Sequence, residues 1–471
     1  MSEKFDFIVI ANRLPVDKVQ SDDGSIEWKR SPGGLVTALM PVMQQHKGAW
    51  IGWDGVTDEN LEPFNYDDMY LVPVPFSKED VELYYEGFSN ATLWPLYHDV
   101  IAPPEFHRTW WDSYLQMNKR FAERAIDIAD EGATIWVHDY QLQLVPHIIR
   151  FSRPDVKIGF FNHIPFPPLE LFAQLPWRRQ VVEGILGADV AGFQRPSDAH
   201  NFMQAVEKFS DSYHSSNNTV TVHSTSEKSH ECYVKDFPIS IDGTRINELA
   251  RDPEIQERAA NFRKQLGNPK TIFFGVDRLD YTKGIRHRLK AYQELLNDGT
   301  LSVEDVTLIQ VASPSRERVN SYIKLRSQIE ETVGRINGRF GTVTKTPIHY
   351  LHQSYTLEEM VALYLSADVM LVTSLRDGMN LVAKEYVAAR INEDGVLILS
   401  EFTGAADELK DALLINPHDI TTVKKVMAAA AKMPEEEQKR RMHALRQQIK
   451  ENTVADWAQL FLDTLQEHSA K

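Results

Sequence analysis

Short apolar runs alternate with segments of helical periodicity along almost the whole chain. The runs are rich in β-branched and aromatic residues, and the segments between them place apolar residues three or four positions apart. This alternation predicts βα units that form parallel sheets with helices on both faces, an α/β fold. The predicted strands are "FDFIVIA", "AWIGW", "ATIWVHD", "KIGFFN" and "ADVAGFQ" in the first half, and "KTIFFGV", "VTLIQVAS", "ADVMLVTS" and "GVLILS" in the second.

The chain is longer than one hydrophobic core usually serves. Its 471 residues predict two domains of roughly 200 to 250 residues each. The segment "FPISIDGTRI", Phe237 to Ile246, contains Pro and Gly and follows the last predicted strand of the first half. We therefore expect an N-terminal domain over residues 1–240. The polar segment from Ser210 to Glu231 is expected to form a surface hairpin, and helices are expected from about Asp419 onward.

The charge and cysteine content exclude several classes of protein. A net charge of −16 argues against a broad surface for nucleic acid or for an acidic membrane. Cys232 is the only cysteine, so the chain cannot form an intrachain disulfide or a cysteine-based zinc site. The apolar run near the N-terminus is too short for a signal peptide, and no stretch is long enough to span a membrane. We expect a cytoplasmic protein.

Polar and charged residues follow many of the predicted strands directly. Ligands of open parallel sheets bind beyond the carboxyl ends of the strands. Because six predicted strands are each followed by such polar and charged residues, we expect these residues to form one site that lines a cleft between the two domains. The six corners are Asn12-Arg13, His138-Asp139-Tyr140, Asn162-His163, Asp277 to Gly284, Ser313 to Arg318, and Leu375 to Asn380.

The corner "LRDGMN" lies between a predicted strand and a predicted helix that begins near Leu381. Free N–H groups at such a helix start favour an anion or a ligand with several hydroxyls. Ordinary capping by Asp or Asn with Gly in the turn explains the same residues equally well. Glu385 lies one turn into this helix, where it could accept hydrogen bonds from a ribose or simply serve as a surface charge.

Two further corners offer positive charge for a phosphate. Arg278 and Lys283 could converge on a diphosphate, and the alternative is that both are solvated loop cations. In the first half, Tyr85 and Trp94 lie in one aromatic segment, where aromatic residues more often serve packing than ligand binding. With Arg13 and Arg316 they could frame a small phosphorylated sugar.

Several common motifs are missing from the sequence. No two aspartates are separated by a single residue, which removes the Asp-x-Asp metal clamp and one common phosphatase nucleophile. The phosphate-binding loop, the dinucleotide fingerprint, the nucleophile elbow and the zinc-protease motif are also absent. Because the Asp-x-Asp clamp is absent, we expect no metal. Because no residue is an obvious nucleophile for a sugar carbon, we expect no covalent intermediate.

Ten segments in order resemble the UDP-forming alpha,alpha-trehalose-phosphate synthase family from about residue 5 to residue 465. They are "ANRLPV", "SPGGLVTAL", "WIGWDG", "FSNATLWPLYH", "VHDYQLQLVP", "GFFNHIPFP", "GVDRLDYTKG", "SPSRERV", "YLHQSYT" and "SLRDGMNLVAKEYVAA".

The resemblance implies a GT-B fold of two Rossmann-like domains facing a central cleft. It implies an acceptor-side domain over residues 1–240, a nucleotide-sugar domain over 241–450, and a helix over 451–471 that crosses back. The implied reaction moves glucose from UDP-glucose to glucose 6-phosphate with retention, the first step of trehalose biosynthesis and a part of the stress response. Many relatives add a phosphatase domain; none is seen here, so release of a phosphorylated disaccharide is expected.

The resemblance also implies a role for each site residue. The donor UDP-glucose would be bound by Gly34, His163, Arg278, Lys283, Asp377, Gly378, Met379, Asn380, Leu381, Val382 and Glu385. The acceptor glucose 6-phosphate would be bound by Arg13, Tyr85, Trp94, Asp139 and Arg316. The catalytic residues would be Asp139, His163, Arg278 and Lys283.

Two other functions stay open at this point. One is a GT-B transferase of the glycogen or sucrose type, and the other is a catalytically silent subunit that binds sugar phosphates. The resemblance also leaves room for a homo-oligomer and for a complex with a trehalose-phosphate phosphatase.

Overall fold

The structure is a computed structural model in which the chain divides into two units. The described residues are 3–20, 26–31, 36, 39–40, 42–43, 46, 48–210, 213–216, 218–222 and 229–469. The first unit comprises Met1–Ile239 and Ala455–Lys471, and the second comprises Ser240–Val454. The sequence-based boundaries at residues 240 and 450 lie near these divisions.

The first unit is built on a ten-stranded sheet whose central strands are parallel. Ile8, Val9 and Ile10 in the middle of this sheet are fully buried, as expected for a parallel strand covered on both faces. In spatial order the strands are β10 (Tyr213–Ser216), β11 (Thr219–Val222), β12 (His230–Asp236), β9 (Val190–Phe193), β8 (Lys157–Phe161), β7 (Ala129–His138), β1 (Phe5–Arg13), β4 (Ala49–Trp53), β6 (Met69–Pro73) and β5 (Phe64–Tyr66).

Helices accompany this sheet, and a separate antiparallel pair joins β2 (Val16–Gln20) to β3 (Ile26–Arg30). The helical segments are α2 (Lys78–Asp80), η1 (Val81–Leu93), α3 (Trp94–Tyr97), α4 (Arg108–Ile128), η2 (Tyr140–Leu142), α5 (Val145–Ser152), α6 (Leu169–Phe172), α7 (Arg178–Ile185) and α8 (Pro196–Phe209).

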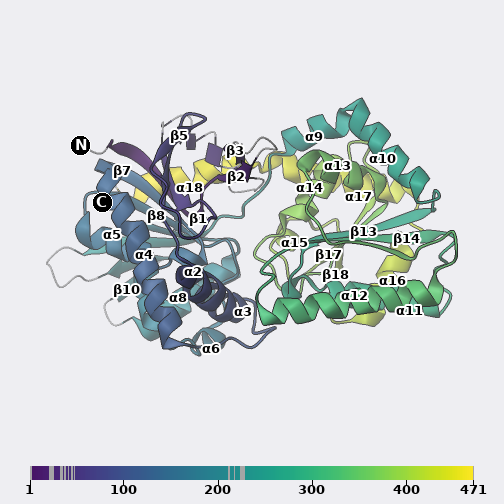
Figure 1. Cartoon of the computed structure of the whole chain (residues 1–471), viewed down its shortest axis with the longest axis horizontal. Coiled ribbons are helices and arrows are strands. Elements are labelled where there is room, and N and C mark those ends of the chain that lie inside the picture. The colour runs from purple at the N-terminus through teal and green to yellow at the C-terminus, as the bar shows by residue number, and fades with distance from the viewer. Residues whose placement is uncertain are drawn as a thin grey trace. The chain divides into compact units, whose positions relative to one another are not determined.

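The last helix, α18 (Val454–Ser469), packs onto the sheet of the first unit. Phe461 stacks on Trp136 of β7 with ring centroids 4.5 Å apart. A Cβ at Gly159 or at Gly192 would lie 2.6 Å or 2.8 Å from the Phe461 ring, so both positions require glycine. Figure 1 shows this helix in yellow beside β8.

The second unit contains a six-stranded parallel sheet. Its strands in spatial order are β15 (Ile348–Leu351), β14 (Val306–Ser313), β13 (Thr271–Arg278), β16 (Val369–Val372), β17 (Val396–Ser400) and β18 (Leu413–Ile415). Its helical segments are α9 (Gly243–Arg251), α10 (Pro253–Gln265), η3 (Tyr281–Lys283), α11 (Ile285–Asn297), α12 (Asn320–Phe340), α13 (Leu357–Ser366), α14 (Leu381–Ala389), α15 (Ala405–Glu408), α16 (Ile420–Ala430) and α17 (Glu435–Glu451).

Two groups of helices cover the two faces of this second sheet (Figure 1). The helices α11, α12 and α16 lie on one side, and α9, α10, α13, α14 and α17 lie on the other. The core under the first group joins strand residues such as Phe273 and Leu308 to helix residues such as Leu289, Ile329 and Met427.

The α/β class predicted from the hydrophobic pattern is confirmed. All nine predicted strands are strands of the two sheets. The polar segment after Ser210 contains the antiparallel hairpin β10–β11, which confirms the predicted hairpin for the residues that are described. No helix of the described part is long and apolar enough to cross a membrane.

Candidate active site

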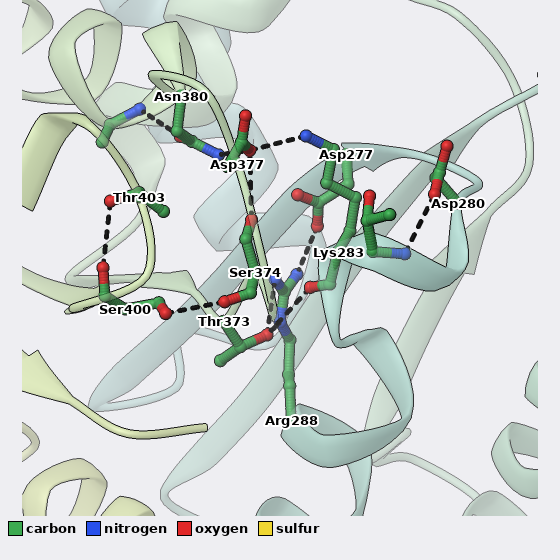
Figure 2. A network of polar contacts seen from close by, with 12 residues as sticks. Asp277, Asp280, Lys283, Arg288, Thr373, Ser374, Asp377, Asn380, Ser400 and Thr403 are labelled. Atoms are coloured by element: carbon green, nitrogen blue, oxygen red, sulfur yellow. Dashed lines mark hydrogen bonds and ion pairs between the residues drawn. The ribbon is translucent and has the colours of Figure 1, made fainter. Parts of the chain in front are cut away.

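The loops after β13, β14 and β16 meet because these three parallel strands are neighbours in the sheet. An ion pair joins the first loop to the third, with Lys283 Nζ 2.6 Å from Asp377 Oδ2. A second ion pair joins the first loop to the β14 loop, with Arg316 Nη1 3.1 Å from Asp280 Oδ2. The three corners predicted in this half of the chain therefore form one cluster. Figure 2 shows the part of this cluster around Lys283.

The carboxylate of Asp377 is the centre of this cluster (Figure 2). Besides Lys283, its Oδ2 accepts hydrogen bonds from Ser374 Oγ at 3.3 Å and from Asn380 Nδ2 at 3.1 Å. The side chains of Lys283 and Asp377 are each only 13% exposed. A charged pair this well shielded from water is held firmly, and its hydrogen bonds are strong because they are charge-assisted.

The start of α14 has a constrained backbone. Asn380 has φ +80° and its side chain caps the helix by accepting from the N–H of Ala383 at 3.1 Å. Gly404 allows the neighbouring turn to approach closely, because a Cβ there would lie 2.1 Å from the Gly378 oxygen. The N–H of Ala405 donates to the Met379 oxygen at 2.8 Å. This packing fixes the direction of the first amides of α14, which have no partner within the helix.

Glu385 lies one turn further along α14. Its Oε2 accepts a hydrogen bond of 2.7 Å from the Tyr364 hydroxyl. Burial raises the pKa of Glu385, and the Tyr364 hydrogen bond opposes that shift. The carboxyl group is therefore oriented by α13 and keeps acceptor capacity for a ligand hydroxyl.

Arg316 lies deeper than a surface phosphate ligand would. Its side chain is 4% exposed and its guanidinium contacts both Asp280 and the Tyr322 hydroxyl. Burial alone would raise the pKa of Asp280, but the charges of Arg316 and then Arg278 hold that pKa below its usual value. Arg278 itself ends β13 and is exposed.

A buried network beneath the cluster was not predicted from the sequence. Arg288 is fully buried, with Nη1 2.9 Å from Asp277 Oδ2 and 2.9 Å from Gln310 Oε1. It also donates to Thr373 Oγ1, the residue before Ser374. Burial raises the pKa of Asp277, and the charge of Arg288 opposes this shift. The network fixes the ends of β13 and β16 from below (Figure 2).

The first unit has its own pocket at the carboxyl ends of β1 and β7. It measures about 450 Å³, and Arg13, Tyr85 and Asp139 all line it. Arg13 lies over the Trp53 ring at 5.1 Å and pairs with Asp17 at 3.0 Å. The structure thus brings together three of the residues that the sequence assigned to the acceptor.

Trp94, the fourth residue assigned to the acceptor in this unit, is not among the residues that line the pocket. It is 4% exposed, and its ring makes tilted contacts with His98, at a centroid distance of 4.1 Å, and with Tyr140, at 5.7 Å. These contacts agree with the packing alternative left open for this aromatic segment.

Asp139 and His163 are joined across neighbouring strands. Asp139 has φ +77° and ψ 169°, and its Oδ1 accepts from the N–H of His163 at 3.1 Å. His163 Nε2 lies 3.1 Å from His138 Nδ1. Burial lowers the pKa of His163 to about 3 and that of His138 well below its usual value. Both imidazoles are therefore neutral near pH 7, one donating to the other.

Three of the site residues have left-handed backbones: Asp139, Arg316 and Asn380. Such conformations are costly for residues other than glycine and persist where the surroundings enforce them, often at functional sites. Gly34, also assigned to the site, lies outside the described residues. Within the described part, no group of three His, Cys, Asp or Glu side chains could hold a metal ion.

Comparison with models of protein families identifies the family of this chain. The model of glycosyltransferase family 20 matches residues 5–467. The chain belongs to glycosyltransferase family 20. The resemblance to UDP-forming alpha,alpha-trehalose-phosphate synthases that the sequence showed is confirmed by this match and by the relatives below.

Relatives within family 20 are similar over their whole length. A trehalose-6-phosphate synthase of Mycolicibacterium gilvum is 54% identical, covering 98% of this chain and 94% of that protein. A UDP-forming alpha,alpha-trehalose-phosphate synthase from Burkholderia vietnamiensis has a TM-score of 0.89 at 33% identity, with 100% and 98% coverage. The Burkholderia xenovorans enzyme in complex with glucose 6-phosphate has a TM-score of 0.87 at 33% identity, with 98% and 99% coverage. These likenesses confirm the predicted GT-B class.

Family 20 membership does not by itself indicate the supporting residues around the cluster. Tyr364 and Arg288 each hold a site residue or a strand end, yet nothing in their sequence positions marks them. Ser374 directly precedes the corner from Leu375 to Asn380, but no role was predicted for it from the sequence. Asp277 and Asp280 are different, because both lie in the corner that the sequence had already singled out. Two carboxylates beside two predicted phosphate ligands could have been interpreted as their ion-pair partners.

Proposed function

We propose that this chain transfers glucose from UDP-glucose to glucose 6-phosphate with retention of configuration, giving α,α-trehalose 6-phosphate and UDP. It is an alpha,alpha-trehalose-phosphate synthase of the UDP-forming type. The likeness to such synthases over the full chain carries this proposal, because one of them is 54% identical and another was solved with glucose 6-phosphate.

The donor is held by the cluster of the second unit. Arg278 and Lys283 bind the diphosphate. When the ligand binds, some of the hydrogen bonding of Lys283 shifts from Asp377 to the diphosphate. The amides of Leu381 and Val382 add the partial positive charge of a helix start. Glu385, oriented by Tyr364, accepts from the ribose hydroxyls.

We assign the transferred glucose to the polar groups of the corner before α14 and to one histidine of the first unit. Asp377 and the amides of the turn before α14 bind its hydroxyls. His163 binds the 6-hydroxyl, and because its imidazole is neutral it can donate or accept there without adding charge. The residues assigned to the glucose are Asp377, Gly378, Met379, Asn380 and His163, with Gly34 approaching the diphosphate.

The acceptor is held by the pocket of the first unit. Arg13 binds the phosphate of glucose 6-phosphate, Tyr85 contributes its hydroxyl, and Asp139 binds the sugar. Arg13 suits this role because it is exposed, lies in the pocket wall, and is already oriented by Trp53 and Asp17. Trp94 supports the wall by packing, and Arg316 completes the phosphate contacts.

The chemistry follows from the residues that surround the leaving group. A retaining glycosidase needs two carboxyls at the sugar carbon, one of them a nucleophile, and no residue is assigned here as a nucleophile. Cations and amide dipoles can instead stabilise the charge that develops on the departing UDP, often the largest catalytic contribution. The leaving phosphate oxygen then takes the proton of the acceptor hydroxyl on the same face, so retention needs no metal.

Cellular context is part of the same proposal. We place the chain in the cytoplasm, acting on small molecules, with no role for nucleic acid or membrane. Self-association and a complex with a trehalose-phosphate phosphatase would be seen by sedimentation of the purified chain alone and with that phosphatase.

Identification of the product tests the proposed function. The purified chain is incubated with UDP-glucose and each of three acceptors: glucose, glucose 6-phosphate and a glucan oligosaccharide. NMR of the product should show two α-linked anomeric carbons and one phosphate ester, only with glucose 6-phosphate. Extension of the oligosaccharide would indicate a glycogen-type transferase. Absence of any product would indicate a silent binding subunit.

A further inference from the structure

A second positively charged pocket lies at the carboxyl end of α14, the end opposite to Leu381 and Val382. It measures about 310 Å³ and is formed by α9, α14 and α17 with the residues that follow α17. Figure 1 shows these three helices on the same side of the second sheet. The lining residues that carry charge are Glu248, Arg251, Arg446 and Lys450.

Arg446 forms the floor of this pocket. It is 5% exposed, and its Nη1 donates to the Val387 oxygen at 3.0 Å and to the Ala388 oxygen at 2.6 Å. Its Nη2 donates to Asn247 Oδ1 at 2.7 Å. A guanidinium has five N–H donors, so these bonds leave two of them unused. Among the described residues, no carboxylate forms an ion pair with it.

The residues that line the pocket carry more positive than negative charge. Burial lowers the pKa of Arg446; the charge of Glu393 opposes that shift, and the smaller effect of Arg251 adds to it. Arg251 and Lys450 are exposed at the rim, where Glu248 is the single acidic residue. A buried cation that forms no ion pair with the described residues is unfavourable, and it is unusual in a chain whose net charge is −16. A bound anion would remove this imbalance.

We propose that this pocket binds a small phosphorylated metabolite and that its occupancy changes the affinity for UDP at the other end of α14. The remaining N–H donors of Arg446 match a phosphate, the rim cations add two charges, and Thr244 offers a hydroxyl to the rest of the ligand. The coupling rests on the proposed function. Arg446 holds the last carbonyls of α14, a helix of nine residues and therefore about 13 Å long, whose first turn belongs to the donor site.

Calorimetric titration of the whole chain tests the binding. The probes are inorganic phosphate and 3-phosphoglycerate, titrated into the wild type and into an Arg251→Gln, Lys450→Gln variant. A Lys264→Gln, Arg335→Gln variant removes the same charge from exposed positions elsewhere on the second unit. We expect binding by the wild type and the control, and affinity at least about tenfold weaker in the pocket variant. No binding by the wild type, or equal binding by all three proteins, would overturn the proposal.

The coupling is tested by titrating UDP with and without saturating 3-phosphoglycerate. A change of at least about twofold in the wild-type dissociation constant for UDP, lost in the pocket variant, supports it. A change that persists in the pocket variant would mean competition at the substrate site and would overturn the coupling, as would no change at all. A wild type that fails to bind UDP would contradict the proposed function, while the phosphate titration would still test the pocket.

Discussion

The ammonium of Lys283 lies 2.6 Å from the carboxylate of Asp377, although the two residues are 94 positions apart in the chain. The pair joins the loop after β13 to the loop after β16, and both side chains are almost buried. It therefore holds the two halves of the proposed donor site in register. It also keeps the lysine in place with its charge compensated until a diphosphate arrives.

Replacing Lys283 with Gln should lower kcat/KM for UDP-glucose by about a hundredfold. The substitution removes a charge-assisted hydrogen bond worth roughly 1.5–3 kcal/mol and leaves Asp377 without its cation. Steady-state kinetics at saturating glucose 6-phosphate measures the effect, with Lys264→Gln as a control on the same unit. A variant with near-normal kcat/KM would exclude Lys283 from the diphosphate site.

Arg316 should serve stability and acceptor binding at once. Arg316→Ala leaves the buried carboxylate of Asp280 without its nearest cation, so we expect a loss of about 3 kcal/mol in the free energy of unfolding. The KM for glucose 6-phosphate should rise while UDP affinity stays the same. Chemical denaturation and steady-state kinetics measure the two effects.

A double variant separates the two roles of Arg316. In Arg316→Met with Asp280→Asn no buried charge is left uncompensated at this pair, so most of the stability should return. Use of glucose 6-phosphate should stay impaired, because the phosphate contact is still missing. Recovery of normal acceptor kinetics in the double variant would show that Arg316 acts only within the fold.

Glu385 should make the enzyme sensitive to the ribose hydroxyls. The wild type is expected to bind UDP about tenfold more tightly than dUDP, the value of one hydrogen bond to a charged group. Glu385→Gln should reduce that ratio to about twofold, whereas Tyr364→Phe retains the carboxylate and most of the discrimination. Competitive inhibition by the two nucleotides measures the ratio, and an unchanged ratio in Glu385→Gln would place the ribose elsewhere.

The depressed pKa of His163 predicts a loss of stability in mild acid. The native pKa is about 3 and the ordinary value is 6.5, so between these values the unfolded chain binds the extra proton. Stability from this group is complete above pH 6.5 and falls as the pH drops, by at most about 1.4 kcal/mol per pH unit. His163→Asn should flatten the decline between pH 6.5 and 5, whereas the exposed His200→Asn should not.

The pH dependence of stability in the His163→Asn variant depends on His138 as well. His138 is also buried and its pKa is lowered, so His163→Asn should keep part of the pH dependence. An unchanged stability profile in this variant would mean that His163 titrates normally in the folded chain.

Much of the fold was predictable because each buried parallel strand appears in the sequence as a short continuous apolar run. Runs such as "FIVIA" and "IFFGV" have no polar side chain, since both faces of these strands are covered. The corners were predictable for a related reason: neighbouring parallel strands end at the same edge, so the residues after them must meet. The Lys283–Asp377 pair is the direct result.

The supporting shell was not predictable in the same way. Arg288 lies inside α11 with ordinary helical spacing, and only the structure shows that it passes close to Gly275, where a Cβ would lie 1.9 Å from its Nη1. Phe461 likewise needs Gly159 and Gly192, which are more than 250 positions away. Such contacts depend on pairs of distant residues, and a single sequence carries no local signal for them.

Release of UDP from UDP-glucose by the purified chain, with and without glucose 6-phosphate, tests the central claim most directly. We predict that glucose 6-phosphate raises the rate at least about a hundredfold, because positioning of the acceptor completes the reaction site. Equal rates with glucose 6-phosphate, with glucose and with no acceptor would contradict a synthase that joins these two substrates.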